Sequence, residues 1–496
     1  MTPSPPVSST AAATCSWGCD VIIDDGDLAK HIEDAQAVAS SEWNRLEYFE
    51  RYFRGDQEPP YTPPTSTREY KALVPRSITN LTRLVINTMV QRCIIDGYRA
   101  SSTDVENAAP WQWWQANGMD SRQKALWEET GKHGYASMLV LPASFRDAAY
   151  DHRTAPIMQP VSPREWYVHM DSWSDDWPQW AIRRDAHDPD KWWIVDDERL
   201  RVVKSQRKPN RLLTIDRDDV HGFEVVPFVP FRNAFDLTRA PIGEIEPIIP
   251  IQDRLNQTVF DLLVATTYSS APQKWIAGMA VPTDEASGQP IIDLKAFAKS
   301  VWLSDDPTTK FGSLPEANLS NIVTAIDSTL RVYGLMSQTP PHYLLGDLVN
   351  LSAEALLAAD TTLAKKIQDH QMIWGEAVES AFRLAAVAAG DMDAADDESS
   401  QVMWRATEPR SVAQQVDALG KMATMLGIPT EALWEQVPGV TSTDLELWRA
   451  MRARDRLRAA TQAALMTPPP PLPGTPAVEQ GPANPTTAAT QIPRTA

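Results

Sequence analysis

The chain has 496 residues and a formal net charge of −19, because 46 Lys and Arg are opposed by 65 Asp and Glu. This length exceeds one ordinary core, so we expect several packed regions. The acidic balance argues against a surface that grips DNA tightly, since it repels phosphate; it suits either a conduit along which a polyanion slides or plain solubility.

The N-terminal stretch carries neither a targeting signal nor a metal site. Cys15 and Cys19 have no second pair to complete a zinc site, and with Cys93 they fit a reduced, intracellular protein. No signal peptide begins the chain, and no apolar run reaches about 18 residues, so neither secretion nor a membrane span is indicated. The Pro, Ser, Thr and Ala content of residues 1–40 predicts a flexible arm.

Three periodic patterns then predict helices. SEWNRLEYFERYFRG, residues 41–55, predicts an amphipathic helix that Gly55 ends, and SITNLTRLVINTMVQRC, residues 77–93, predicts a core helix. SRQKALWEETGKHGYASMLVLP, residues 121–142, changes from helical spacing to a short apolar run, which predicts a helix followed by a strand.

Residues 156–235 have the texture of a meander of short strands. Alternating segments such as EWYVHM, WAIRRD, KWWIVDD and RLRVV are separated by Asp, Pro, Asn and Gly turns. Many tryptophans fall here, including Trp173, Trp177, Trp180, Trp192 and Trp193. Stacking on bases is one interpretation, but packing between a sheet and helices is favoured because no basic lining accompanies them.

Two helices of similar length are predicted on either side of a small insert. The first extends from Pro250 to Ser269, where Pro272 blocks continuation, and the second spans residues 319–334. The segment between them, residues 273–317, predicts a small αβ module. After a loop, residues 352–390 predict one helix of roughly 55 to 60 Å, long enough to cross a whole assembly.

The C-terminal part predicts shorter helices and then a tail. Helical patterns cover residues 411–427, 430–437 and 442–465. The arginines of the last pattern are mixed with Asp and Glu, which indicates a solvated or intersubunit face. From Thr467 the composition is Pro, Ala, Thr and Gln, so this tail is expected to be disordered.

A search for catalytic motifs assigns none. The sequence holds no phosphate-binding G-x-x-x-x-G-K-[ST] loop, no H-E-x-x-H, no G-x-S-x-G and no Rossmann glycine fingerprint. Its histidines are not paired at metal-ligand spacing, and its adjacent Asp pairs indicate exposed turns. We therefore predict no catalytic residue, no metal and no cofactor.

The order of elements resembles the portal family of tailed phages, particularly the branch from phages of actinobacteria. EYFERYFRGDQEPPY is similar to the opening helix and turn, VVPFVPFRNAFD to the strand that leaves the wing, and GEIEPIIPIQDRLNQTVFDLL to the helix after it. The most specific stretch is TPPHYLLGDLVNLSAEALLAADTTLAKKIQDHQMIWGEAVESAFRLA. The resemblance covers roughly Glu42 to Ala460.

The resemblance implies a mixed α+β, mainly α, portal fold in a dodecameric ring. The implied regions are a flexible arm (1–40), a wing of helices plus a β-rich part (41–240), a first stem helix (241–270), a clip (271–317), a second stem helix (318–337), a tunnel loop (338–351), a long bridging helix (352–390), a crown (391–465) and a disordered tail (466–496).

It also implies which residues face DNA. The tunnel-loop candidates are His342, Tyr343, Leu344, Leu345, Asp347, Leu348 and Asn350. The channel-lining stem candidates are Asp253, Arg254, Asn256, Gln257 and Asp261. A weakly charged, apolar loop can touch DNA without a strong phosphate bond, although without the family a buried connector loop would be the preferred interpretation.

The implied function is a non-enzymatic ring at the capsid vertex, through which double-stranded DNA is packaged and ejected. Implied partners are the major capsid protein, the scaffolding protein, the terminase large subunit and a head–tail adaptor, with no membrane. The implied locations are the virion portal vertex and, during assembly, the host cytoplasm. The alternatives are another virion structural or head-completion protein, or a packaging enzyme, which the missing phosphate loop disfavours.

Overall fold

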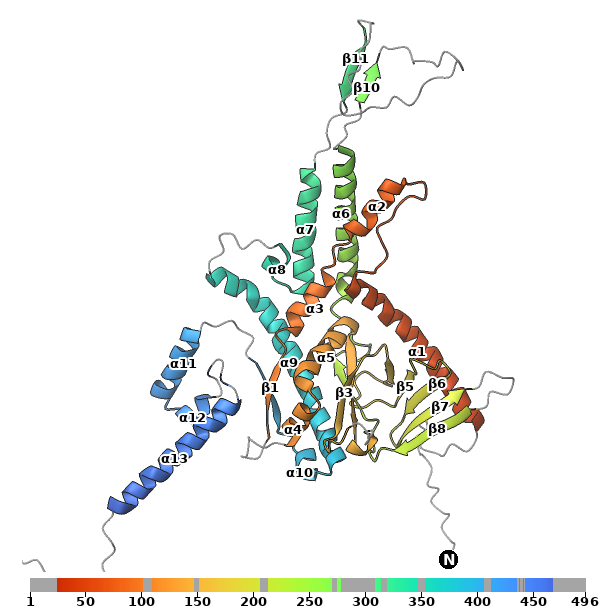
Figure 1. Cartoon of the computed structure of the whole chain (residues 1–496). Helices are drawn as coiled ribbons and strands as arrows, with labels where there is room; N and C mark the ends of the chain where they lie inside the picture. The colour runs from red at the N-terminus through yellow and green to blue at the C-terminus, as the bar shows by residue number, and fades with distance from the viewer. Residues whose placement is uncertain are drawn as a thin grey trace, which may run out of the picture. The chain divides into compact units, whose positions relative to one another are not determined.

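The computed structural model divides into two units, residues 1–407 and residues 408–496, each considered by itself. Figure 1 shows their elements in chain order. The residues that the structure describes are 25–100, 109–146, 151–205, 213–269, 274–277, 308–313, 319–345, 353–405, 412–434, 437, 440 and 442–466. The predicted disordered tail from residue 466 onward lies almost entirely outside them.

The α-helices described in the first unit are α1 (Asp25–Arg54), α2 (Arg68–Ser77), α3 (Thr82–Val90), α4 (Ala109–Ala116), α5 (Met119–His133), α6 (Ile249–Ser269), α7 (Ser320–Ser337), α8 (Pro341–Leu345), α9 (Ala353–Ala389) and α10 (Met392–Ala395). The strands are β1 (Ile95–Arg99), β2 (Tyr135–Leu141), β3 (Ile157–Val161), β4 (Trp166–His169), β5 (Trp180–Arg184), β6 (Lys191–Val195), β7 (Arg199–Ser205), β8 (Leu213–Val220), β9 (Phe228–Arg232), β10 (Lys274–Ala277), β11 (Lys310–Ser313) and β12 (Gln401–Trp404).

The meander predicted over residues 156–235 is confirmed for β4 to β8, whereas β3 and β9 at its ends join β2 in another sheet. Strands β4 to β8 form one antiparallel sheet in sequential order, as hairpin-connected strands with alternating burial do. A second sheet has the order β3-β2-β9, and its central strand β2 is buried on both faces. Two further pairs, β1 with β12 and β10 with β11, complete the described sheets.

Helix α1 begins at Asp25, so the predicted flexible arm over residues 1–40 is wrong for residues 25–40. Ile32, Ala35 and Ala39 recur at helical spacing and are buried in one cluster with Trp180 and Trp192. Two of the three are alanines, whose small side chains let the helix lie close to the sheet. Composition alone did not show this stripe. Residues 1–24 of the arm lie outside the described part.

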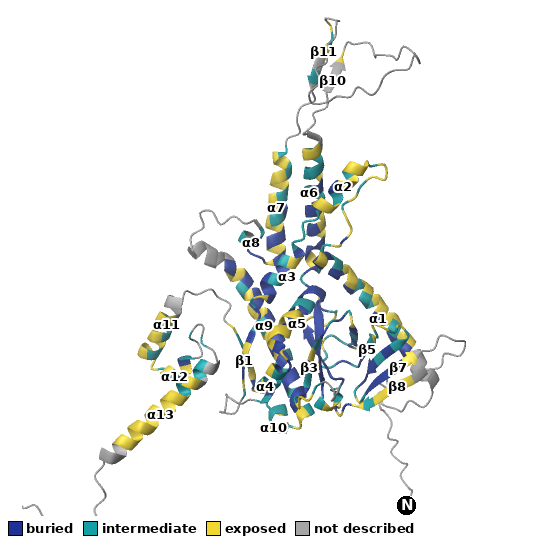
Figure 2. Ribbon diagram, viewed as in Figure 1, coloured by how far each residue is buried: buried dark blue, intermediate teal, exposed yellow. Residues whose placement is uncertain are grey.

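Stacked aromatic side chains lie within the main hydrophobic core of the first unit. Trp127 of α5 stacks on Trp374 of α9 with ring centroids 4.8 Å apart, and both side chains are fully buried. Trp127 also meets Phe231 of β9, so helix α5, helix α9 and the sheet share one interior. Figure 2 shows the buried residues gathered around α5, β3 and α9.

The two predicted helices around the insert are confirmed as α6 and α7, which lie side by side (Figure 1). Pro250 sits in the first turn of α6, where no helical hydrogen bond is lost. Of the insert, the structure describes β10 and β11, an antiparallel pair. Any helix in the predicted αβ module lies outside the described residues.

The long helix is also confirmed, as α9 with 37 residues, or roughly 55 Å. It ends at Ala389 and is followed by Gly390, whose φ of +77° is the left-handed conformation that favours glycine, and Asp391 then caps α10. The loop before α9 was predicted as residues 338–351, but residues 341–345 form the short helix α8. Residues 346–352 lie outside the described part.

The second unit contains the predicted short helices α11 (Val412–Met425), α12 (Thr430–Leu433) and α13 (Ser442–Met466). Trp434 and Trp448 meet edge to face with centroids 5.9 Å apart. Arg452 and Arg456 of α13 both donate to Glu431 of α12, at 3.1 and 2.9 Å, so part of the arginine cluster pairs within the unit.

No described helix combines the length and the apolar character that crossing a bilayer requires.

Candidate functional site

The α6–α7 pair presents a weakly charged outer surface. Helix α6 carries Asp253, Arg254 and Asp261, and α7 carries Asp327 and Arg331, so the charged side chains of the pair are three carboxylates and two guanidinium groups. The remaining outward side chains are small, polar or apolar. Phosphate binding depends on the number of cations available, so this surface can lie beside a polyanion without holding it.

Four of the five stem candidates reach this surface at least in part. Arg254 and Asp261 are exposed, and Gln257 is half-buried and donates to Asp261 at 3.0 Å. Asp253 is exposed but accepts the hydroxyl of Tyr52 at 2.9 Å, which ties α1 to α6. Partial burial raises the pKa of Asp253, and the hydrogen bond from Tyr52 offsets part of that shift.

Asn256 does not belong among the channel-lining candidates. Its side chain is buried, and its Oδ1 accepts the backbone N–H of Thr79 at 3.0 Å and the amide of Gln252 at 2.9 Å. Gln252 in turn accepts the N–H of Leu81 at 3.3 Å. The two amides, one helical turn apart, fasten residues 79–81 to α6. In the sequence, only their spacing of four residues, which places both amides on one face of the helix, could have indicated this role.

We call the first unit without α6–α8, β10 and β11 the body. The predicted tunnel-loop residues begin in α8, and three of them make contacts there. The Tyr343 hydroxyl accepts from Arg92 at 2.7 Å, and Arg92 also donates to Asp360 of α9 at 3.2 Å. The ring Nε2 of His342 lies 3.5 Å from the same carboxylate. Leu344 is partly buried beside Tyr333.

Leu345 ends α8. The other candidates, Asp347, Leu348 and Asn350, lie outside the described residues. The described part of the predicted loop is therefore held by the body through Arg92 and Asp360.

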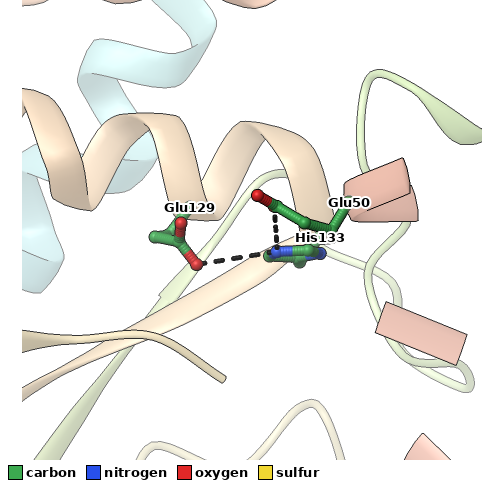
Figure 3. A group of neighbouring side chains, drawn as sticks. All are labelled: Glu50, Glu129 and His133. Atoms are coloured by element: carbon green, nitrogen blue, oxygen red, sulfur yellow. Dashed lines mark ion pairs between the residues drawn. The ribbon is translucent and has the colours of Figure 1, made fainter. Parts of the chain in front are cut away.

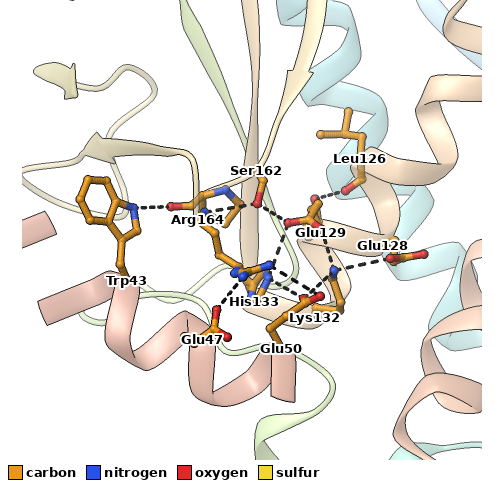
Figure 4. A network of polar contacts seen from close by, with 12 residues as sticks. Trp43, Glu47, Glu50, Leu126, Glu128, Glu129, Lys132, His133, Ser162 and Arg164 are labelled. Atoms are coloured by element: carbon orange, nitrogen blue, oxygen red, sulfur yellow. Dashed lines mark hydrogen bonds and ion pairs between the residues drawn. The ribbon is translucent and has the colours of Figure 1, made fainter. Parts of the chain in front are cut away.

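A second polar group, which the sequence did not reveal, lies inside the body where α1 meets α5. Glu50, Glu129 and His133 each place one potential ligand atom within 4.8 Å of the others (Figure 3). The Lys132 ammonium, however, lies 2.9 Å from Glu50 and 2.6 Å from Glu129 (Figure 4). Lys132 thus supplies the positive charge that a metal ion would bring, and the group acts as an ion-pair junction.

His133 is the unusual member of this junction. Its side chain is fully buried, and its Nε2 lies 3.7 Å from Glu50 and 3.6 Å from Glu129. Burial, reinforced by the neighbouring Lys132, lowers the pKa of His133 to about 3, so the ring is neutral near pH 7. Burial raises the pKa of Glu50, but Lys132 and Arg164 outweigh it and hold that pKa below its ordinary value.

Comparison with known protein families identifies the family of this chain. The model of the family described as phage portal protein, SPP1 Gp6-like, matches residues 35–456, from α1 into α13. The chain belongs to this family. The resemblance noted from the sequence is thereby confirmed, and the α6–α7 pair, α8 and α9 all fall within the matched residues.

Two portal proteins from mycobacteriophages are similar over most of their length. The portal protein of Mycobacterium phage D29 is 25% identical over 358 residues, which cover 68% of this chain and 71% of that protein. The portal protein of Mycobacterium phage L5 is 25% identical over 391 residues, covering 75% of this chain and 77% of that protein.

Proposed function

We propose that the chain forms the ring at the capsid vertex through which double-stranded DNA is packaged and ejected. The observation that supports this most is the α6–α7 pair, two weakly charged helices that pack side by side. Both helices lie within the residues that match the portal family. Repeated around an axis, such pairs would line a channel that DNA passes without being held. The protein acts as a structural element and carries out no catalysis.

The regions implied by the family follow from this proposal. Helices α6 and α7 form the stem, the segment with β10 and β11 the clip, α9 the bridging helix and residues 391–465 the crown. Twelve copies make the ring. It meets the major capsid protein and the scaffolding protein during assembly in the host cytoplasm. It binds the terminase large subunit during packaging and the head–tail adaptor afterwards.

Imaging of the purified full-length chain tests the ring. Negative-stain micrographs are expected to show annular particles with an axial opening, and mass photometry to give a particle of twelve times 55.2 kDa. A chain that stays monomeric at high concentration and capsid-like ionic strength contradicts the proposal, as does a compact particle without a symmetry axis.

Charge addition on α7 tests the passage of DNA. Thr324 and Ser328 are exposed on this helix, so the double substitution T324K/S328K adds two cations per copy to the stem. We expect the variant ring to bind short duplex DNA more tightly, with a steeper salt dependence, and to package more slowly. A matched control, A186K/H187K, places two lysines at exposed positions in the β5–β6 turn and should change neither property.

A further inference from the structure

Helix α9 is joined to the corner between α7 and α8 by two polar contacts, the first partly buried and the second buried. The first is made by Asp360, which accepts from Arg92, and Arg92 in turn donates to the Tyr343 hydroxyl of α8. Asp360 and His342 are both nearly buried, with side chains 12% and 11% exposed. The position of α8 is therefore tied to the position of Asp360.

The second contact is made by Lys366. Its ammonium donates to the backbone carbonyl of Ser337, the last residue of α7, at 3.0 Å, and it also binds the carboxylate of Glu244. Glu244 lies just before α6 and also accepts the side-chain amide of Asn233 at 2.9 Å. The Lys366 side chain is 6% exposed. One buried cation thus connects α9 with the end of α7 and the approach to α6.

The corner between these contacts is short and internally hydrogen-bonded. Gln338 takes the left-handed conformation with φ of +54°. The Thr339 N–H donates to Gly334 at 2.9 Å, and the Tyr343 N–H donates to Pro340 at 3.1 Å. Ser337 and Thr339 are buried. Since few residues separate the two contacts, a displacement at one is passed directly to the other.

Polar contacts of this kind are costly to break. Apolar side chains can slide and repack, but a buried ammonium or carboxylate that loses its partner is left uncompensated, at a large cost in free energy. Asp360 and Lys366 are six residues apart, about 9 Å along the helix axis, so they contact the corner at two separate positions.

We propose that Asp360 and Lys366 are positioning residues that make α9 and the α7–α8 corner move as one body. The relevance of this coupling to DNA passage rests on the function proposed above, because α8 begins the segment expected to face the channel. The structural coupling itself is independent of ring formation.

Hydrogen exchange of the full-length protein tests the coupling at two backbone amides, Thr339 beside the Lys366 contact and Tyr343 beside the Asp360 contact. In D360N we expect exchange to rise at least tenfold at Tyr343 and also at Thr339, which Asp360 does not touch. K366M should likewise raise exchange at both amides. This crossed effect is the signature of a corner held as one unit.

Matched controls lie on the same helix. Lys365 and Asp369 are exposed neighbours, so K365M and D369N make the same chemical changes without touching the corner. Both controls should leave exchange at Thr339 and Tyr343 unchanged. Exchange in α5 and β2 should stay constant in all four variants, which separates release of the corner from general loss of stability.

Three results would overturn the coupling. They are effects confined to the amide nearest each substitution, equal effects from the exposed controls, or wild-type exchange at Tyr343 as fast as in a free peptide. Failure of the proposed ring would appear separately, as monomers in micrographs of the wild type. Each proposal can therefore fail without the other.

Discussion

The body and the α6–α7 pair differ in how far their apolar side chains are exposed. In the body, Trp127 and Trp374 are 0% exposed and stack on one another, whereas Leu335 near the end of α7 is 79% exposed and Met336 beside it 54%. The body completes its interior within one chain. The helix pair leaves apolar surface that neighbouring copies can bury in the proposed ring.

The largest expected effect comes from emptying the body interior. Trp127→Ala removes the side chain that α5, α9 and β9 share, and should lower the free energy of unfolding by about 3 to 5 kcal/mol. Urea denaturation of the full-length chain measures this loss. Trp111→Ala is the matched control, since Trp111 is only partly buried, and should cost clearly less. Equal losses of unfolding free energy in the two variants would contradict a special role of the buried Trp127 in the interior.

An intermediate effect concerns His133, because its pKa of about 3 in the folded chain lies below the ordinary value of 6.5. Between these values the unfolded chain binds a proton that the folded chain does not. The free energy of unfolding should therefore fall as the pH decreases from 6.5, by up to about 1.4 kcal/mol per pH unit from this group.

His133→Leu isolates the contribution. The pKa values of His169 and His221 are also lowered by burial, but these residues remain in both proteins, so the difference between wild type and variant reports His133. The comparison belongs between pH 6.5 and 4.5. Below pH 4.5, carboxylates such as Glu50, whose pKa is lowered, also lose their stabilising effect. Parallel curves in this window would contradict a neutral His133.

Long patterns could be predicted from the sequence, while individual contacts could not. Helix α9 and the five-strand meander were predicted because their hydrophobic patterns repeat over many residues. Asn256 was expected to face a channel because the resemblance places its helix in the stem. Its partner Thr79 is 177 residues away in sequence, a contact that only the fold determines.

The same limit applies to the buried ions. Lys132 and Lys366 are chemically identical to the exposed Lys365, and nothing in their neighbouring residues marks them as buried. Each lysine is compensated in the interior by a carboxylate from a distant segment, Glu50 for Lys132 and Glu244 for Lys366, and Lys132 also pairs with Glu129 on its own helix. The start of α1 was missed for a related reason, because its stripe of small residues becomes apolar surface only against the sheet.

The smallest effect on the isolated chain is expected at the outer surface of α7. The double substitution L335S/M336S removes exposed side chains that support no interior, so the free energy of unfolding should change by less than about 0.5 kcal/mol. Met372→Ser on α9 is the matched control, since Met372 is 69% exposed in the same way.

Assembly separates these two variants. If neighbouring copies bury the α7 surface, L335S/M336S should reduce the fraction of rings at least tenfold at equal concentration, because each copy contributes the same lost contact around the ring. Mass photometry counts the rings and the free chains directly. Rings that persist undiminished would place the copy-to-copy contact elsewhere, and the exposure of Leu335 would then carry no meaning for assembly.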